Sequence, residues 1–173
     1  MSNIKYTFFS DNETMTQVFK ETIEVFKKNY KYISSEKIDQ IKSNEVLHEL
    51  TTDLQDIGWW VETGKKKEEK IRLTVYNNDG TPKRYYEVDG LHKQSGTIME
   101  IEACRAIINN QILRDVLKAS SLDNINYLIL SVRNMTKQKK KTLYDYNNVI
   151  FDIDDVWRNI KPPKLKGILV IGY

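Results

Sequence analysis

Cysteine, proline and glycine are scarce in this sequence, and long apolar runs are absent. Of its 173 residues, one is cysteine, three are proline and seven are glycine. The single Cys104 excludes an internal disulfide framework and a cysteine-rich zinc site, and a reducing, cytoplasmic setting is expected. The longest apolar runs, of about six residues, are far shorter than the roughly 20 that a membrane helix needs, so no membrane partner is expected.

Length and charge are those of an ordinary globular domain. Hydrophobic residues make up 40% and charged residues 29% of the chain, which is typical of soluble globular proteins. The length predicts a single domain over residues 1–173. A net charge of +3 is too small to favour nucleic acid over other partners. Met1 to Asp11 show no basic region followed by an apolar stretch and a cleavage site, so no secretory signal is expected.

Helical and strand periodicities alternate along the chain. The strand–helix–strand unit at 97–133 predicts a parallel crossover, and the three strands before it, joined by short loops, are expected to be antiparallel. The polar, lysine-rich stretch at 136–148 is typical of a mobile surface loop. The fold class is therefore α/β, with a mixed central β-sheet flanked by helices. We expect helices at 12–30, 36–57, 104–121 and 152–160, and strands at 71–76, 83–89, 97–103, 127–133 and 166–173.

Three acidic residues on neighbouring strands carry the chemical information. Glu100 and Glu102 are two apart in a strand and share a face, and Asp89 ends the preceding strand, at the base of a predicted hairpin loop at 90–96. Acids gathered on the middle of a sheet repel each other and lose solvation. A divalent cation such as Mg²⁺, or Mn²⁺ as a substitute, resolves the conflict and suits phosphodiester hydrolysis. The alternative is an exposed sheet face whose acids pair with lysines.

Polar residues also interrupt the apolar stripe of the helix that follows. Arg105 and Asn109 fall inside the stripe and lie in the first turns, so they are candidates for contacting the acids or a phosphate. The alternative is that Arg105 only pairs with Glu100 or Glu102. Arg133, at the end of the next parallel strand, is a further candidate at the same edge of the sheet.

At this point the chain resembles the PD-(D/E)xK nuclease superfamily, which has the restriction-endonuclease-like αβββαβ core. The match covers about residues 36–133 and includes Asp89 in YYEVDG and Glu100-Ile101-Glu102 in TIMEIEA. The resemblance implies that Asp89 and Glu100 ligate Mg²⁺. The motif lysine would fall at position 102, where this chain has Glu102. A Glu-x-Glu motif is similar to BamHI-like variants, in which the second Glu acts as general base, and to non-cutting members.

The resemblance implies further site residues and a function. Glu49 or Asp53 would supply an additional acid from the first core helix, and Lys93 would replace the missing motif lysine from the loop after Asp89. The helix at 12–30 and the helix and strand at 150–173 are additions to the core, and the C-terminal half is also similar to uncharacterised bacterial and phage proteins. We therefore expect an Mg²⁺-dependent endonuclease acting on DNA, in a homodimer. The alternative is a non-catalytic nucleic-acid-binding or protein-interaction module.

Overall fold

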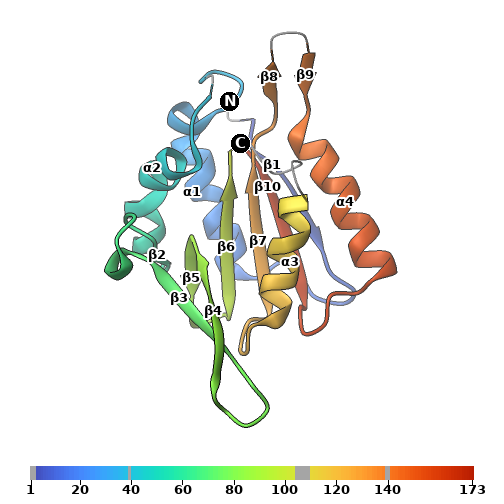
Figure 1. Cartoon of the computed structure of the whole chain (residues 1–173). Helices are drawn as coiled ribbons and strands as arrows, with labels where there is room; N and C mark the ends of the chain where they lie inside the picture. Colours follow the sequence, from blue (N-terminus) through green and yellow to red (C-terminus); the bar gives the residue numbers. More distant parts are fainter. Residues whose placement is uncertain (1–2, 39, 104–109, 139–140) are drawn as a thin grey trace.

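A six-stranded mixed β-sheet forms the centre of the molecule (Figure 1). The computed structural model describes residues 3–38, 40–103, 110–138 and 141–173. The three central strands are parallel, and each remaining strand is antiparallel to its neighbour. From edge to edge the strands are β1 (Lys5–Phe9), β10 (Gly167–Gly172), β7 (Tyr127–Val132), β6 (Thr97–Glu102), β5 (Gly90–His92) and β2 (Trp60–Val61).

Helices cover both faces of this sheet. On one face, α1 (Gln17–Ile33) and α2 (Ser43–Asp56) bury an apolar core that includes Met99 and Ile101 of β6. On the other face, α3 (Gln111–Ser121) and α4 (Asp145–Asn159) cover a second core. Figure 1 shows α3 crossing in front of the sheet and α1 behind it. Because strand side chains alternate between faces, each central strand contributes to both cores.

A two-stranded arm lies beside the second core. Its strands are β3 (Ile71–Tyr76) and β4 (Pro82–Val88), which pair with each other outside the central sheet. Ile71 and Val88, at the base of the arm, are buried in the second core. Asp89 is the single residue between β4 and β5, so it lies where the chain leaves the arm and enters the sheet.

The predicted fold class is confirmed, as are most of the strands. The predicted strands at 71–76, 83–89, 97–103, 127–133 and 166–173 correspond to β3, β4, β6, β7 and β10. β6 and β7 are parallel, as the strand–helix–strand unit predicts. The predicted hairpin between 83–89 and 97–103 differs, because the expected loop at 90–96 contains β5, and β5 rather than β4 pairs with β6 through the turn at 93–96. β1, for which the sequence analysis made no prediction, extends the sheet beyond β10.

The second helix is shorter than the prediction of 36–57, because the chain before it is held in turns. α2 begins at Ser43, and Gln40 has a positive φ of 57°, which a helix does not accommodate. Ser35 donates a hydrogen bond to the backbone carbonyl of Tyr173 and accepts one from the backbone N–H of Asn134. These bonds tie the segment to the end of the sheet. Ile41 in this segment is buried although it is not helical. Its position in the sequence therefore looks like a continuation of the apolar stripe of the helix.

The prediction of a mobile loop over 136–148 is wrong. Two short strands, β8 (Thr136–Gln138) and β9 (Lys141–Leu143), pair as an antiparallel hairpin, and α4 already begins at Asp145. Lysine-rich strands lack the apolar alternation from which a strand is recognised. In α4, Tyr146, Val149 and Ile153 are buried at helical spacing, so the helix starts seven residues before the predicted 152. Among the described residues, no helix is long and apolar enough to cross a membrane.

Candidate functional site

Asp89 and Glu100 face each other at the junction of the arm and the sheet. Gly90 pairs with Met99 in the β5–β6 ladder, and the same register places Asp89 opposite Glu100. The Asp89 carboxylate accepts a hydrogen bond of 2.7 Å from the backbone N–H of Ile101. The bend at Asp89 thus turns its side chain back onto β6. Two of the three predicted acids are therefore brought together, on the face of the sheet that α3 covers.

Burial makes these carboxylates resist ionisation. It raises the pKa of Asp89 to about 6, although the hydrogen bond from Ile101 opposes the rise, and the negative charge of Glu62 adds to it. The Glu100 side chain is only 6% exposed, and burial followed by the charge of Asp89 raises its pKa well above the usual range. Neighbouring acids whose pKa values are raised by burial and by each other's charge mark a candidate functional site.

Helix α3 contributes a third buried acid and a lysine. Asp115 is 1% exposed, and burial raises its pKa. The Lys118 Nζ atom lies 2.7 Å from Glu100 Oε1 and 3.1 Å from Asp115 Oδ1, and it donates a hydrogen bond of 3.2 Å to the backbone carbonyl of Glu87. Burial alone would lower the pKa of Lys118, but the charges of Glu100 and Asp115 outweigh it and raise the pKa. Lys118 is therefore a cation inside the site.

Glu62 connects the buried acids to a polar groove. Its backbone N–H bonds to the carbonyl of Asp89 at 2.9 Å, and its side chain pairs with Lys70. Glu62 and Lys70 also line a groove of about 850 Å³ between the start of α2 and the segment after β2. Glu49, one of the two predicted additional acids, lines the same groove. Glu49 therefore shares a groove with Glu62, whose backbone is bonded to Asp89.

The charges of the cluster fit a divalent cation. Among the described residues, three acids, Asp89, Glu100 and Asp115, share one buried cation, Lys118. Fully ionised, this set would carry two excess negative charges, which protons or a 2+ ion would neutralise. No group of three or more acidic, histidine or cysteine side chains in the described ranges converges as a complete metal cage. Two facing carboxylates still suit Mg²⁺, which keeps several waters and often uses only one or two carboxylates.

The remaining residues predicted around the acids lie in different places. Glu102 is half-buried on the same face as Glu100, two residues nearer the C-terminal end of β6. Arg105 and Asn109 lie outside the residues that the structure describes. Arg133 is at the expected end of the sheet, but it is 1% exposed and donates a hydrogen bond of 3.5 Å to the carbonyl of Ile38, before α2. That contact ties Arg133 to the α2 side.

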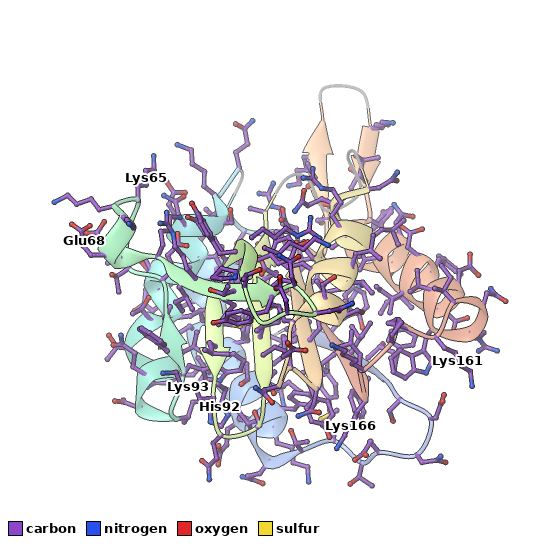
Figure 2. All side chains as sticks on the ribbon, turned by 60° about the horizontal axis from the view of Figure 1, so that its bottom comes forward. Lys65, Glu68, His92, Lys93, Lys161 and Lys166 are labelled. Carbon is purple, nitrogen blue, oxygen red and sulfur yellow. The ribbon has the colours of Figure 1, made fainter. Side chains whose placement is uncertain are left out.

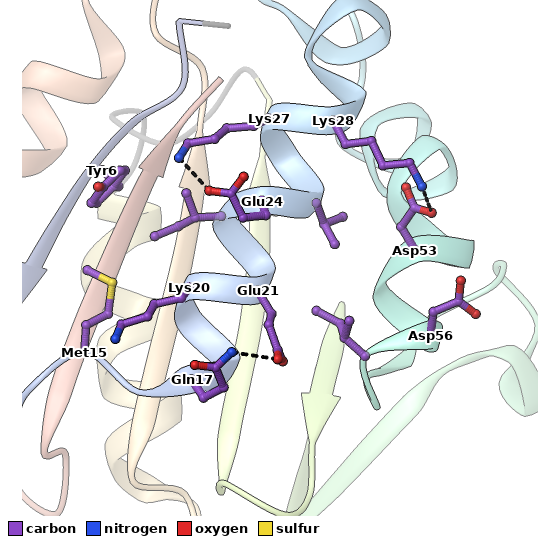
Figure 3. A pocket seen from close by; sticks show the side chains of 13 residues that line it. Tyr6, Met15, Gln17, Lys20, Glu21, Glu24, Lys27, Lys28, Asp53 and Asp56 are labelled. Atoms are coloured by element: carbon purple, nitrogen blue, oxygen red, sulfur yellow. Dashed lines mark hydrogen bonds and ion pairs between the residues drawn. The ribbon is translucent and has the colours of Figure 1, made fainter.

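Asp53, the other predicted additional acid, lies between the two N-terminal helices. Its carboxylate bonds to Lys28 and to Asn29, both at 2.7 Å. The hydrogen bond from Lys28 is the main reason that the pKa of Asp53 is lowered. Figure 3 shows the Lys28–Asp53 pair at the rim of a pocket between α1 and α2. Asp53 is thus satisfied by partners on the α1 side of the molecule.

Lys93 lies in the turn before β6. Its Nζ atom is 4.4 Å from the centre of the Trp60 ring, which is a cation–π contact. Figure 2 shows Lys93 beside His92 and well apart from Lys65, which lines the groove. His92 is 8% exposed, its Nδ1 lies 2.8 Å from Ser95 Oγ, and burial lowers its pKa.

The sequence reasoning missed Asp115, Lys118 and Glu62. A signal for Asp115 was present, because it lies three residues after Ile112 and one before Val116, within the apolar stripe of α3. Lys118 follows one turn later and is reached only because α3 packs over β6. Glu62 carries no sequence signal, since its approach to Asp89 depends on pairing between β2 and β5.

Comparison with solved structures identifies the architecture. The crystal structure of restriction endonuclease BglII complexed with a DNA 16-mer matches with a TM-score of 0.57 and 15% sequence identity, over 98% of this chain and 77% of that chain. The fold is restriction-endonuclease-like. At this identity the likeness concerns the restriction-endonuclease-like fold alone. No family model and no curated protein matches the chain.

Proposed function

We propose that this protein is a metal-dependent nuclease that hydrolyses DNA phosphodiester bonds. The observation that carries the proposal is the pair of facing carboxylates, Asp89 and Glu100, buried at one point of a restriction-endonuclease-like fold. Lys118 offsets one charge of the three buried acids, and burying the others in ionised form without a further cation is costly. The matching solved structure is that of a restriction endonuclease in complex with DNA, which supports DNA as the substrate class.

In this proposal each acid has a separate task. Asp89 and Glu100 hold Mg²⁺, or Mn²⁺ in its place. When bound, the ion supplies positive charge that polarises a phosphoryl oxygen. Glu102, half-buried on the same face, orients a water and accepts its proton, as in a BamHI-like variant with Glu-x-Glu. Glu49 is the additional acid, placed along the groove with Glu62. Arg105, Asn109, Arg133 and Lys93 remain candidate contacts for phosphate or DNA.

The lysine-rich hairpin is a suitable contact for a nucleic acid backbone. β8 and β9 project beyond the C-terminal ends of β6 and β7, the end of the sheet toward which Glu102 lies (Figure 1). Lys137 and Lys141 are exposed on it, and residues 136–143 include no acid. Phosphate neutralisation by lysines drives sequence-independent binding of DNA. The hairpin therefore supports nucleic acid as the partner; a homodimer stays a prediction.

Metal binding is the first test. Titration of the purified protein with Mn²⁺ in a calorimeter should give saturable binding that Asp89→Asn weakens at least about tenfold, the minimum expected on losing a ligand or its support. Asp155→Asn, which removes an exposed carboxylate on α4, is the matched control and should bind like wild type. Equal affinity in Asp89→Asn and wild type would exclude Asp89 as a ligand.

Plasmid nicking with Mg²⁺ or Mn²⁺ separates cutting from binding. Wild type and Asp155→Asn should convert supercoiled plasmid to nicked or linear forms, and Asp89→Asn should not. DNA binding without any cutting, in buffers that saturate the metal site, would favour the non-catalytic nucleic-acid-binding module. Glu102 supports this alternative, because it stands where the superfamily motif has lysine.

Salt dependence tests the hairpin as the DNA contact. Neutralising two lysines by the double substitution Lys137→Gln and Lys141→Gln should lower the log–log salt slope of duplex binding by about 2, since each phosphate contact contributes roughly 0.9. Metal affinity should not change. An unchanged slope would show that the hairpin does not touch the duplex.

A further inference from the structure

Lys118 is the one buried cation among the described acid-cluster residues, and it is shared between two acids. Its Nζ atom is 2.7 Å from Glu100 and 3.1 Å from Asp115, and its side chain is 13% exposed. Glu100 Oε1 is fully buried, and among the described residues its ion pair with Lys118 is the contact that offsets its charge. A carboxylate oxygen has two lone pairs, so this oxygen can also bind a metal ion.

A metal at Glu100 would compete with Lys118 for that oxygen. Two cations at one carboxylate oxygen repel each other, and the repulsion is strong in a buried site. Lys118 has two other partners at hand, the carboxylate of Asp115 and the backbone carbonyl of Glu87. Asp115 is 1% exposed and lies one helical turn before Lys118. It thus offers Lys118 an alternative partner without moving the helix.

We infer that Lys118 is an exchangeable counter-ion of this site, which pairs with Glu100 until a divalent cation binds there and is then held beside the site by Asp115. This inference rests on the proposed function. The ammonium stays charged in both positions, so no proton is transferred. In its second position Lys118 adds positive charge next to the phosphoryl group, where negative charge grows during hydrolysis. Asp115 is a positioning residue that acts through Lys118.

Opposite effects on metal affinity distinguish this role from a structural one. Lys118→Met keeps the length of the side chain and removes the competing charge, so Mn²⁺ should bind severalfold more tightly by calorimetry in the absence of DNA. Asp115→Asn leaves Lys118 with Glu100 as its main partner, so Mn²⁺ should bind more weakly. A purely structural role would weaken binding in both variants, because each would disturb the packing of α3.

Cleavage rates and the metal affinity of the double variant complete the test. At saturating metal, plasmid cleavage by Lys118→Met should fall about 100-fold, which is typical for loss of one charge-stabilising group. Lys166→Met, an exposed lysine before β10, is the matched control and should match wild type. If Asp115 acts through Lys118, adding Asp115→Asn to Lys118→Met should change metal affinity far less than it does in wild type.

The outcomes separate this inference from the proposed function. If wild type binds Mn²⁺ and cuts plasmid, but Lys118→Met binds no more tightly or cuts as well as wild type, the counter-ion role is wrong and the nuclease stands. If wild type neither binds Mn²⁺ nor cuts, the proposed function itself fails. Thermal melting of each variant checks folding; should Lys118→Met melt early, Lys118→Gln is measured in its place, with the same expected gain in affinity.

Discussion

The two faces of the central sheet both carry an apolar core, but only the face under α3 also buries the acid cluster, and strand β6 shows the difference. Met99 and Ile101 enter the apolar core under α1 and α2. Glu100, between them in the sequence, turns to the other face, where it meets Asp89, Asp115 and Lys118. Both faces gain stability from apolar burial, but the face under α3 also buries charges that cost stability. In the proposed function a bound metal ion offsets the cost of this acid face, and four experiments test that contrast.

The largest difference should appear in cleavage. Glu100→Gln preserves the shape of the side chain but removes a metal ligand, so plasmid cleavage should fall by at least about 100-fold. Glu68→Gln, an exposed acid in the short helix before β3, should cut like wild type. Initial rates of nicking at saturating Mg²⁺ give the comparison. Retained cleavage in Glu100→Gln would remove the acid face from the chemistry.

The free energy of unfolding should depend strongly on Met99 and little on its neighbour Glu100. Met99 is fully buried in the apolar core, so Met99→Ala should cost about 2–5 kcal/mol of unfolding free energy. Metal-free Glu100→Gln should lose none at pH 8, because it removes a carboxylate whose ionisation burial opposes. Urea denaturation of both variants measures the difference. A large loss in Glu100→Gln would mean that its ion pair with Lys118 holds the fold together.

The central strands and the facing of Asp89 and Glu100 were predictable from the sequence. Strands β6, β7 and β10 follow from their apolar runs, and the facing of Asp89 and Glu100 follows from the short hairpin between them. These features depend on local pattern and on strand register. Asp115 could have been found, since an acid inside an apolar helical stripe needs a buried partner.

Other parts of the site depend on packing that local pattern does not encode. Lys118 reaches Glu100 only through the way α3 lies over β6, and Glu62 approaches Asp89 through a two-residue strand. Arg133 was placed at the correct end of the sheet, but one of its hydrogen bonds goes to the carbonyl of Ile38, in a segment whose turns override helical periodicity. Long-range contacts of single polar side chains were thus the least predictable features.

The ionisation of Asp89 should make the free energy of unfolding depend on pH. Its pKa is about 6 in the folded protein and about 3.8 in the unfolded chain, so the unfolded chain releases its proton first as pH rises. This group therefore lowers stability between about pH 4 and pH 6, by roughly 1–3 kcal/mol in total, and the loss persists above that range. Urea titrations of metal-free wild type and Asp89→Asn should differ in slope across this window. Parallel curves would contradict the raised pKa.

The smallest expected effect distinguishes the two candidate acids of α2. Glu49 lines the groove with Glu62, whereas Asp53 is bonded to Lys28 and Asn29 on the α1 side. Glu49→Gln should therefore weaken Mn²⁺ binding severalfold through the loss of a nearby negative charge, and Asp53→Asn should weaken it less. Asp53→Asn should instead show its effect in melting temperature, by roughly 2 °C, as expected for an exposed pair. If calorimetry showed that Asp53→Asn weakens Mn²⁺ binding more than Glu49→Gln does, Asp53 would be the acid nearer to the metal. The metal site would then include residues from both faces of the sheet.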